Sequence, residues 1–415
     1  MVTARNPAGE AGAAGAAAAP ATLAEAAGLL RESAAAVVFR GGGTKAYLTA
    51  GTSPVTVSTR SLTGIVLHDP LDGVAVVRAG TPLAQLQAEL APHGQWLAID
   101  PPFSDRGATV GGIFSSNDAG PRRLAYGTLR DLVIGATVVT GDGVVARSGG
   151  RVIKNVAGFD LARLYCGAFG TLGLVAELAL RLHPLRSASR TLEVICPLDS
   201  ALEIAQAVRA AGLTPTALDW ISDGLAPRAA TGGAAAAGSL LVRFEERSER
   251  ATAAQTGELH GLCEQRRLAV TTLEGDAELQ AWAGVDRLLA GEGGDDGGGD
   301  AVLRAVTRPS RVVSAARSLG ELAGESATGC RFASHVLVGV HTACLGGPMS
   351  GTVGSAWRSA VEQLGGHVTV RRASAEAGEI ERWGPAPGAK AIMRRLKSEL
   401  DPGNRCAPGT FVGGI

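Results

Sequence analysis

Four glycine-rich stretches between residues 41 and 177 could bring main-chain amides against an anion. The first is RGGGTK, in which Gly41, Gly42 and Gly43 follow a short β-branched run and precede Thr44 and Lys45. Consecutive glycines leave backbone N–H groups without Cβ atoms in the way, so such a turn can form an anion-binding nest. A lysine at its end adds a charge-assisted contact to a phosphate oxygen. The pattern is typical of either a phosphate-binding loop or a glycine-rich hairpin turn.

The other three stretches combine glycines with small polar residues. They are GATVGGIFSSNDAG from residue 107, GTLRD from residue 127, and KNVAGFDLARLYCGAFGTLGLVAE from residue 154. Small residues in succession let a flat ring or a diphosphate lie against the main chain. Each stretch alone could be ordinary turns, but the four in this order make a more specific pattern. A P-loop and a GxGxxG leading into a helix are both absent, which weighs against nucleoside triphosphatases, kinases and Rossmann-type proteins.

Short β-branched runs separated by glycine recur over residues 35–185 and predict strands. We expect these strands to position the four glycine-rich stretches. Among them, TPLAQLQAELAPHG predicts a helix with Thr81 as N-cap, Pro82 as first helical residue and Gly94 at its end. The segment AKAIMRRLKSEL predicts a second helix, which Asp401 and the proline after it would stop.

The region from 190 to 375 is richer in alanine, leucine and arginine. Two low-complexity pieces within it, 231–238 and 291–300, are typical of surface loops. The run SHVLVGVHTA predicts a strand that carries His335 and His341 on one face. No motif for a catalytic set is evident in this region.

Composition narrows the class of protein. The 415 residues carry 39 Lys and Arg against 39 Asp and Glu, so a nucleic-acid partner is not expected. The apolar runs are too short to span a bilayer, and the Ala/Gly-rich N-terminus lacks the features of a secretory signal. The six cysteines are scattered, which excludes clustered zinc or iron–sulfur ligands and indicates a reducing, cytoplasmic location. No metal site is expected.

The order of the four stretches resembles the FAD-binding domain of the vanillyl-alcohol-oxidase (PCMH) type. DAGPRR, YGTLRDLVIGATVVTGDG and KNVAGFDLARL are more closely similar to the FAD-binding subunit of bacterial glycolate oxidase. The ending WGP…MRRLKSELDPG…APGTFVGGI is similar to that family's tail. Strong resemblance covers residues 35–185 and 383–415, and the middle matches weakly.

The resemblance implies an α+β fold with a two-lobed PCMH-type FAD-binding domain, a smaller α+β cap domain and a C-terminal return segment. The implied division is a flexible arm (1–30), the FAD-binding domain (31–188), the cap (189–375) and a returning helix and tail (376–415). The residues it places at FAD are Gly41, Gly42, Gly43, Thr44, Lys45, Thr109, Gly111, Gly112, Ser115, Ser116, Asn117, Gly120, Gly127, Lys154, Asp160, Gly173 and Val175.

Two departures from the family pattern matter. Many relatives attach the flavin to a histidine in the first loop, but this chain has Lys45, Ala46 and Tyr47 there, so we expect non-covalent FAD. The tail has Ala407-Pro408-Gly409 where the family commonly has Asn-Pro-Gly, which puts in doubt any contact of the missing Asn side chain.

Oxidation of a 2-hydroxy acid needs a base, a hydride acceptor and a group that holds the carboxylate. The histidine-rich H-x-G-D-G-N motif of related large flavin subunits and D-lactate dehydrogenases is absent. The catalytic residues are therefore unknown from the sequence, with His335, His341 and Arg122 as candidates. Arg122, in GPRR, could serve at the flavin or at a subunit contact.

The absence of that histidine-rich motif favours a subunit of a multi-subunit glycolate oxidase that works with a larger flavin subunit and an iron–sulfur subunit. Its location would be cytoplasmic, with any contact to the inner membrane made through those partners. The alternatives are a self-sufficient FAD dehydrogenase of another 2-hydroxy acid, such as D-lactate, and a scaffold subunit without flavin.

Overall fold

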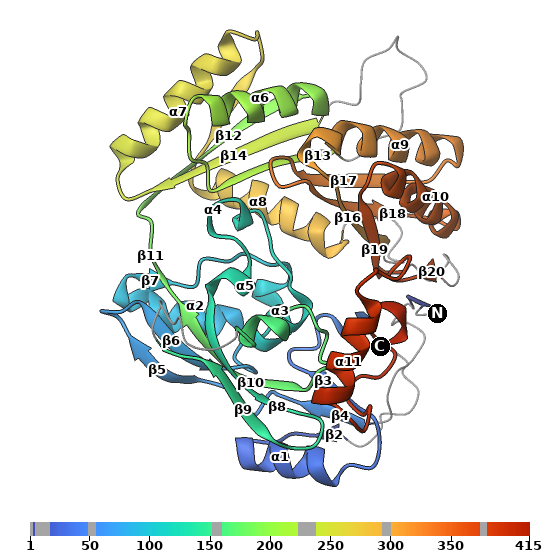
Figure 1. Cartoon of the computed structure of the whole chain (residues 1–415). Coiled ribbons are helices and arrows are strands. Elements are labelled where there is room, and N and C mark those ends of the chain that lie inside the picture. The colour runs from blue at the N-terminus through green and yellow to red at the C-terminus, as the bar shows by residue number, and fades with distance from the viewer. Residues whose placement is uncertain are drawn as a thin grey trace.

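The computed structural model describes residues 3–4, 17–48, 55–151, 160–222, 238–292, 300–373 and 380–415. Its α+β fold has two lobes, one above the other in Figure 1. The first lobe is built on a five-stranded sheet and a three-stranded sheet from residues 17–181. The second lobe is built on an eight-stranded sheet from residues 188–372.

The five-stranded sheet of the first lobe is antiparallel, with the order β5-β6-β10-β8-β9. Its strands arise where the sequence has β-branched runs, as expected. Helices α2, α3, α4 and α5 accompany this sheet, and α2, α3 and α5 bury leucine, isoleucine and phenylalanine side chains in the sheet's core. The elements are β5 (Ile65–Asp69), β6 (Val74–Arg78), α2 (Leu83–Leu90), α3 (Val110–Ser116), α4 (Arg123–Tyr126), α5 (Leu129–Leu132), β8 (Val133–Val139), β9 (Val145–Gly149) and β10 (Leu174–Arg181).

The three-stranded sheet is parallel and has helix α1 (Leu23–Glu32) against it. Its order is β2-β4-β3, formed by Ala17–Ala18, Val55–Ser58 and Val37–Arg40. The hydroxyl of Thr22 accepts a hydrogen bond from the Glu25 amide and so caps α1. Buried alanine and leucine side chains of α1 pack into a core shared with β8 and β10. The expectation of a flexible arm is therefore wrong for residues 23–30, because this alanine-rich segment has an apolar face to bury.

The eight-stranded sheet of the second lobe has the order β15-β12-β14-β13-β17-β18-β16-β19, and every neighbouring pair is antiparallel. Helices α6, α7, α9 and α10 cover its outer face, and α8 packs on the face that looks toward the first lobe (Figure 1). The elements are β12 (Ala188–Cys196), α6 (Leu198–Ala210), β13 (Ala217–Ser222), β14 (Gly238–Glu246), α7 (Glu249–Glu264), β15 (Val270–Leu273), α8 (Gly275–Ala290), β16 (Ala301–Val306), α9 (Val312–Glu325), β17 (Cys330–His335), β18 (Val340–Leu345), α10 (Ser350–Gln363) and β19 (His367–Arg372).

The chain then returns to the first lobe through helix α11 (Lys390–Leu400), which ends at Asp401 as the sequence predicts. Beyond it, the Val37 amide donates to the Arg405 carbonyl and the Ala407 amide donates to the Val37 carbonyl, so the tail lies beside β3. Short pairings complete the fold: β1 (Thr3–Ala4) with β20 (Ile380–Glu381), and β7 (Gln95–Trp96) with β11 (His183–Pro184).

Two local expectations are wrong. Thr81 does not cap α2, because its hydroxyl bonds to the Arg78 carbonyl and the Gly64 amide, and Pro82 precedes the helix. The run around His335 and His341 is a hairpin rather than one strand, since residues 336–339 form a turn between β17 and β18. Gly339, at φ 73°, supplies the left-handed position of that turn.

The hairpin places the two histidines on opposite faces of the sheet. His335 pairs with Val340, and His341 pairs with Ser334, so their side chains alternate. The fully buried His341 ring stacks on Phe332 within the outer core and has hydrogen-bond contacts with the hydroxyls of Thr307 and Ser334. His341 is thus a packed core residue and no longer a catalytic candidate.

Burial lowers the pKa of His341 to about 3, with a further contribution from His335. A neutral native histidine costs stability as pH falls from 6.5 toward 3, because only the unfolded chain gains that proton. Between pH 7.5 and pH 5 this loss amounts to about 2 kcal/mol. We expect the His341→Gln variant to lose about 2 kcal/mol less than the wild type over that interval, as urea unfolding at both pH values would measure. Equal losses would contradict the assignment.

Candidate functional site

A cavity of about 790 Å³, which includes the open space at its mouth, lies in the first lobe. We call it the glycine pocket. It lies where the C-terminal end of β3 and the first residues of β10 meet the start of α3. The lining residues are Phe39, Arg40, Gly41, Gly42, Gly43, Thr44, Lys45, Ala46, Leu48, Thr59, Ala79, Ala108, Thr109, Gly111, Gly112, Ser115, Ser116, Phe169, Gly170, Gly173, Leu174 and Val175.

The first two glycine loops touch each other at this pocket. A Cβ at Gly41 would overlap the Thr109 hydroxyl, and one at Gly42 would overlap the Gly107 carbonyl oxygen. These two glycines therefore permit the close approach of the second loop, a contact that the sequence pattern did not indicate. Gly43 has no atom within 4 Å of its Cβ position and is required by its φ of 80°.

The first loop also carries the amides that are free to bind an anion. Within the described residues, the N–H groups of Gly42, Gly43 and Thr44 have no backbone acceptor. The amides at the start of α3 are already used, because the Gly111 amide donates to the Ala79 carbonyl (2.7 Å) and the Gly112 amide to the Thr109 hydroxyl (3.2 Å). A diphosphate therefore fits against the first loop better than against α3.

An unpaired guanidinium nitrogen adds to this fit. Nε of Arg40 is buried without a hydrogen-bond partner in the described part of the chain, and Arg40 lines the glycine pocket. A buried donor of this kind is costly unless a bound group accepts from it. Apolar atoms of Phe39, Phe169 and Val175 supply a surface on which a flat ring can rest.

Four of the predicted cofactor residues lie elsewhere or have another role. Gly120 gives close approach to the Asp100 carbonyl, and Gly127, at φ 77°, packs against Asp131. Asn117 ends α3 in a left-handed conformation, with a buried side-chain oxygen that has no partner among the described residues. Asp160 is exposed and pairs with Arg163, and Lys154 lies outside the described residues.

Several residues that line the glycine pocket were not predicted from the sequence, and they are next to predicted ones in the chain. Arg40 and Phe39 immediately precede the first glycines, and Phe169 and Gly170 lie within the fourth stretch. A rule that extends each glycine motif by one or two residues on either side would have included them.

A smaller cavity, of about 300 Å³ including the open space at its mouth, lies between the two lobes next to the glycine pocket. We call it the cationic pocket. It is lined by Tyr47, Pro102, Phe103, Asp118, Leu289, Val302, Arg304, Thr342 and Arg371. Lys45 extends from the first glycine loop to Asp118 beside this pocket, so the two cavities share that loop.

Three cations surround one carboxylate there. The Asp118 carboxylate lies 3.0 Å from Lys45 Nζ, 3.1 Å from Arg304 and 2.6 Å from Arg371. Burial alone would raise the pKa of Asp118, but the attraction of Arg371, Lys45 and Arg304 outweighs it and holds the pKa well below its usual range. Burial lowers the pKa values of Lys45 and Arg304, the latter to about 10. The two arginines alone outnumber the single ionised carboxylate, so the cluster keeps a formal surplus of at least one positive charge. It can therefore take up an anion.

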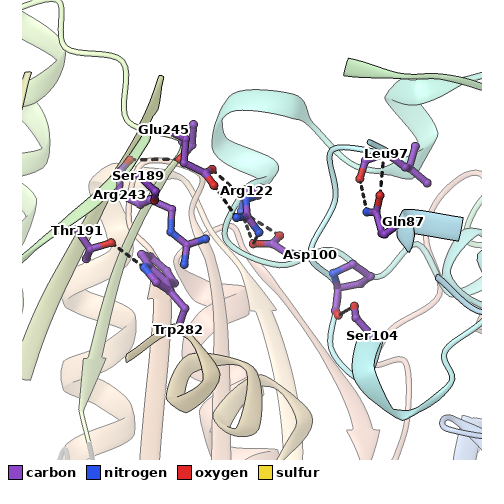
Figure 2. Close-up of polar contacts among 12 residues, drawn as sticks. Gln87, Leu97, Asp100, Ser104, Arg122, Ser189, Thr191, Arg243, Glu245 and Trp282 are labelled. Atoms are coloured by element: carbon purple, nitrogen blue, oxygen red, sulfur yellow. Dashed lines mark hydrogen bonds and ion pairs between the residues drawn. The ribbon is translucent and has the colours of Figure 1, made fainter. Parts of the chain in front are cut away.

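A second polar network, which includes Asp100, Arg122 and Glu245, also joins the two lobes (Figure 2). The Arg122 guanidinium donates to both oxygens of Glu245 on β14, at 3.0 and 2.6 Å, and lies over the Trp96 ring. The Arg122 amide donates to Asp100, whose pKa burial raises to about 6. Arg122 thus bridges two lobes of one chain, and its guanidinium is already paired with Glu245 and Asp100, so no catalytic role is assigned to it.

His335 lies on the inner face of the second lobe. Its Nδ1 is 2.8 Å from both carboxylate oxygens of Asp219 on β13, and the two residues are 4% and 0% exposed. Thr342 of the cationic pocket is on the same face of the neighbouring strand, because Ala333, two residues before His335, pairs with it.

Comparisons with known proteins agree with this geometry. A family model described as "FAD binding domain" matches residues 14–149. The chain is 40% identical over 171 residues to glycolate oxidase subunit GlcE of Escherichia coli, covering 41% of this chain and 49% of that protein. It is 33% identical over 190 residues to glycolate oxidase subunit GlcD of Bacillus subtilis, covering 45% and 40%. The matches thus span half or less of these relatives.

Solved structures confirm the fold. Alkyldihydroxyacetonephosphate synthase superposes with a TM-score of 0.70 over 94% of this chain and 75% of that one, at 15% identity. Among the described residues, none of the helices has the length and apolar character needed to cross a membrane. The cofactor is FAD, which the family model and the glycine pocket both support.

Proposed function

We propose that this FAD-dependent oxidoreductase is the flavin-binding subunit of a multi-subunit 2-hydroxy-acid oxidase. In this proposal it takes part in the oxidation of glycolate to glyoxylate and passes electrons to an iron–sulfur partner. The similarity to two glycolate oxidase subunits supports the substrate class and the assembly. The observation that carries the proposal is the surplus of buried cations beside the glycine pocket.

The cationic pocket suits the carboxylate of the substrate. Arg304 and Arg371 come from β16 and β19 of the second lobe, whereas Lys45 comes from the first glycine loop. A carboxylate held there would be positioned at the boundary of the two lobes, next to the cavity that takes FAD. FAD, when bound, supplies the acceptor for the hydride of the substrate's C–H bond.

Non-covalent attachment is part of this proposal. The residues that line the glycine pocket include no histidine, cysteine or tyrosine within the described chain, and these side chains are the ones that could bond to a flavin ring. We propose that Gly42, Gly43 and Thr44 bind the diphosphate through main-chain amides, with Arg40 beside them. Acid precipitation of the purified protein should release the flavin into the supernatant.

The Arg371→Gln variant tests the carboxylate site. A charge-assisted hydrogen bond contributes about 1.5–3 kcal/mol, so its loss should raise the substrate concentration for half-maximal flavin reduction by about 10- to 100-fold. FAD content should stay that of the wild type, because Arg371 does not line the glycine pocket. Arg308→Gln, an exposed site after β16, is the matched control and should leave both quantities unchanged. Unchanged substrate dependence in Arg371→Gln would contradict the carboxylate site.

The overall function is tested with the chain alone and with the assembly that copurifies with it from its host. Each is mixed with glycolate or D-lactate under anaerobic conditions, and the absorbance of oxidised flavin is followed. Bleaching of the flavin in either preparation supports the proposal, and identification of an iron–sulfur subunit in the assembly supports the electron route. An assembly that contains FAD but oxidises neither acid would overturn it.

A self-sufficient dehydrogenase of another 2-hydroxy acid, such as D-lactate, is the second candidate. One observation favours it: a cationic pocket and a histidine–carboxylate pair both lie within this single chain. Sustained turnover by the isolated chain with a dye acceptor would support this candidate. Absence of FAD after reconstitution would instead support a scaffold subunit.

A further inference from the structure

We propose that the Asp219–His335 pair accepts the hydroxyl proton of the substrate, so that this chain contains its own general base. The inference rests on the proposed function and adds a catalytic residue to it. His335 would act at Nε2, and Asp219 would be a positioning residue that holds the ring through Nδ1.

The contact between His335 Nδ1 and the Asp219 carboxylate is the main support for this proposal. A carboxylate within 2.8 Å of Nδ1 fixes the ring and favours the tautomer with its proton on that nitrogen. Nε2 then has its lone pair free, and it has no hydrogen-bond partner among the described residues. A buried acid and histidine are costly to keep unless packing or function requires them, and the outer-face His341 shows that this hairpin can bury a neutral histidine without a carboxylate.

The position of the pair is suitable for the reaction. The charged and titratable groups within electrostatic range of the pair are Arg123 on α4 and Asp100, with His341 on β18 behind the sheet. Arg123 is within electrostatic range of both Asp219 and Asp118, a residue of the cationic pocket. Thr342 of the cationic pocket shares the inner face of the sheet with His335 on the neighbouring strand, so a substrate whose carboxylate is held by Arg304 and Arg371 could direct its hydroxyl toward His335.

The proposed step moves one proton and one hydride from the substrate. The O–H bond of the 2-hydroxy acid breaks and its proton goes to Nε2 of His335. FAD, when held in the glycine pocket, would supply the two-electron acceptor for the hydride of the broken C–H bond, and the C=O bond of the 2-oxo acid would form. The imidazolium produced is stabilised by Asp219 and returns its proton to solvent.

The test is the rate of flavin reduction by glycolate and D-lactate in single-turnover mixing of the FAD-loaded chain, measured from pH 5 to pH 9. A base must be neutral, so the wild-type rate should rise with pH to a plateau. His335→Asn should lower the plateau by about 10²- to 10⁴-fold and remove that rise. Asp219→Asn should retain a smaller rate than the wild type, because the His335 ring loses the carboxylate that holds it.

His341→Gln is the control and should remain within about threefold of the wild-type rate at pH 8, while FAD content and melting temperature verify folding of each variant. A His335→Asn variant that is folded, holds FAD and keeps the wild-type rate and pH profile would overturn the base assignment alone. An isolated chain that is not reduced, beside an assembly that is, would overturn it and leave the proposed function standing. Failure of both preparations would overturn both.

Discussion

Gly42→Val should abolish FAD retention. The valine Cβ would overlap the Gly107 carbonyl oxygen, so the first loop must move away from the second. The amides of Gly42, Gly43 and Thr44 would then leave the positions that we assign to the diphosphate. We expect the flavin-to-protein ratio after purification to fall at least tenfold, as absorbance of the released flavin would measure. Because both loops lie at the surface of a cavity, the protein should remain folded.

Gly28→Val is the matched control for this substitution. Gly28 is also a glycine of the first lobe, in α1, and nothing lies within 4 Å of its Cβ position. It should retain FAD at the wild-type ratio. If Gly42→Val copurifies with stoichiometric FAD, the first loop does not bind the diphosphate.

Lys397→Met should destabilise the protein more than any surface substitution in α11. The buried Lys397 amine donates to the Asp401 carboxylate (2.6 Å), the Thr171 carbonyl (2.7 Å) and the Cys406 carbonyl (2.7 Å). Methionine fills similar space but leaves these acceptors and the buried Asp401 charge without the ammonium group. Breaking a buried pair in this way costs about 3–5 kcal/mol, which urea unfolding would detect as a lower midpoint.

Lys397 also links the C-terminal tail to the first lobe, because it donates to the carbonyls of both Cys406 and Thr171. Thr171 immediately follows Gly170 of the glycine pocket. The variant should therefore bind FAD more weakly as well. Arg395→Met, at an exposed position of the same helix, is the control and should change stability by less than about 0.5 kcal/mol. A similar midpoint for the two variants would contradict the role of Lys397.

Local patterns in the sequence predicted the first lobe well. Glycine motifs and β-branched runs are contiguous signals, so they indicate strands and loops before any partner is known. Most of the predicted residues of the first two loops line one cavity, as do Gly173 and Val175. What the motifs could not reveal is that Gly41 and Gly42 face Thr109 and Gly107, because that contact joins residues more than sixty positions apart.

The second lobe was harder to predict, since its functional groups come together only through the sheet. Asp219 and His335 are 116 positions apart, and Asp118 meets Arg304 and Arg371 from two further strands. The hairpin at His335 was also misread, because valine on both sides of Gly339 outweighed the turn signal of that glycine. Placing His341 in the outer core required knowledge of the register with Ser334.

The measurement that tests the central claim most directly is an experimental structure of the FAD-loaded chain. We expect diphosphate oxygens within hydrogen-bond distance of the amides of Gly42, Gly43 and Thr44, with the flavin ring beside Phe169 and Val175. A diphosphate bound away from residues 42–44, or a glycine pocket left empty beside FAD bound elsewhere, would contradict it.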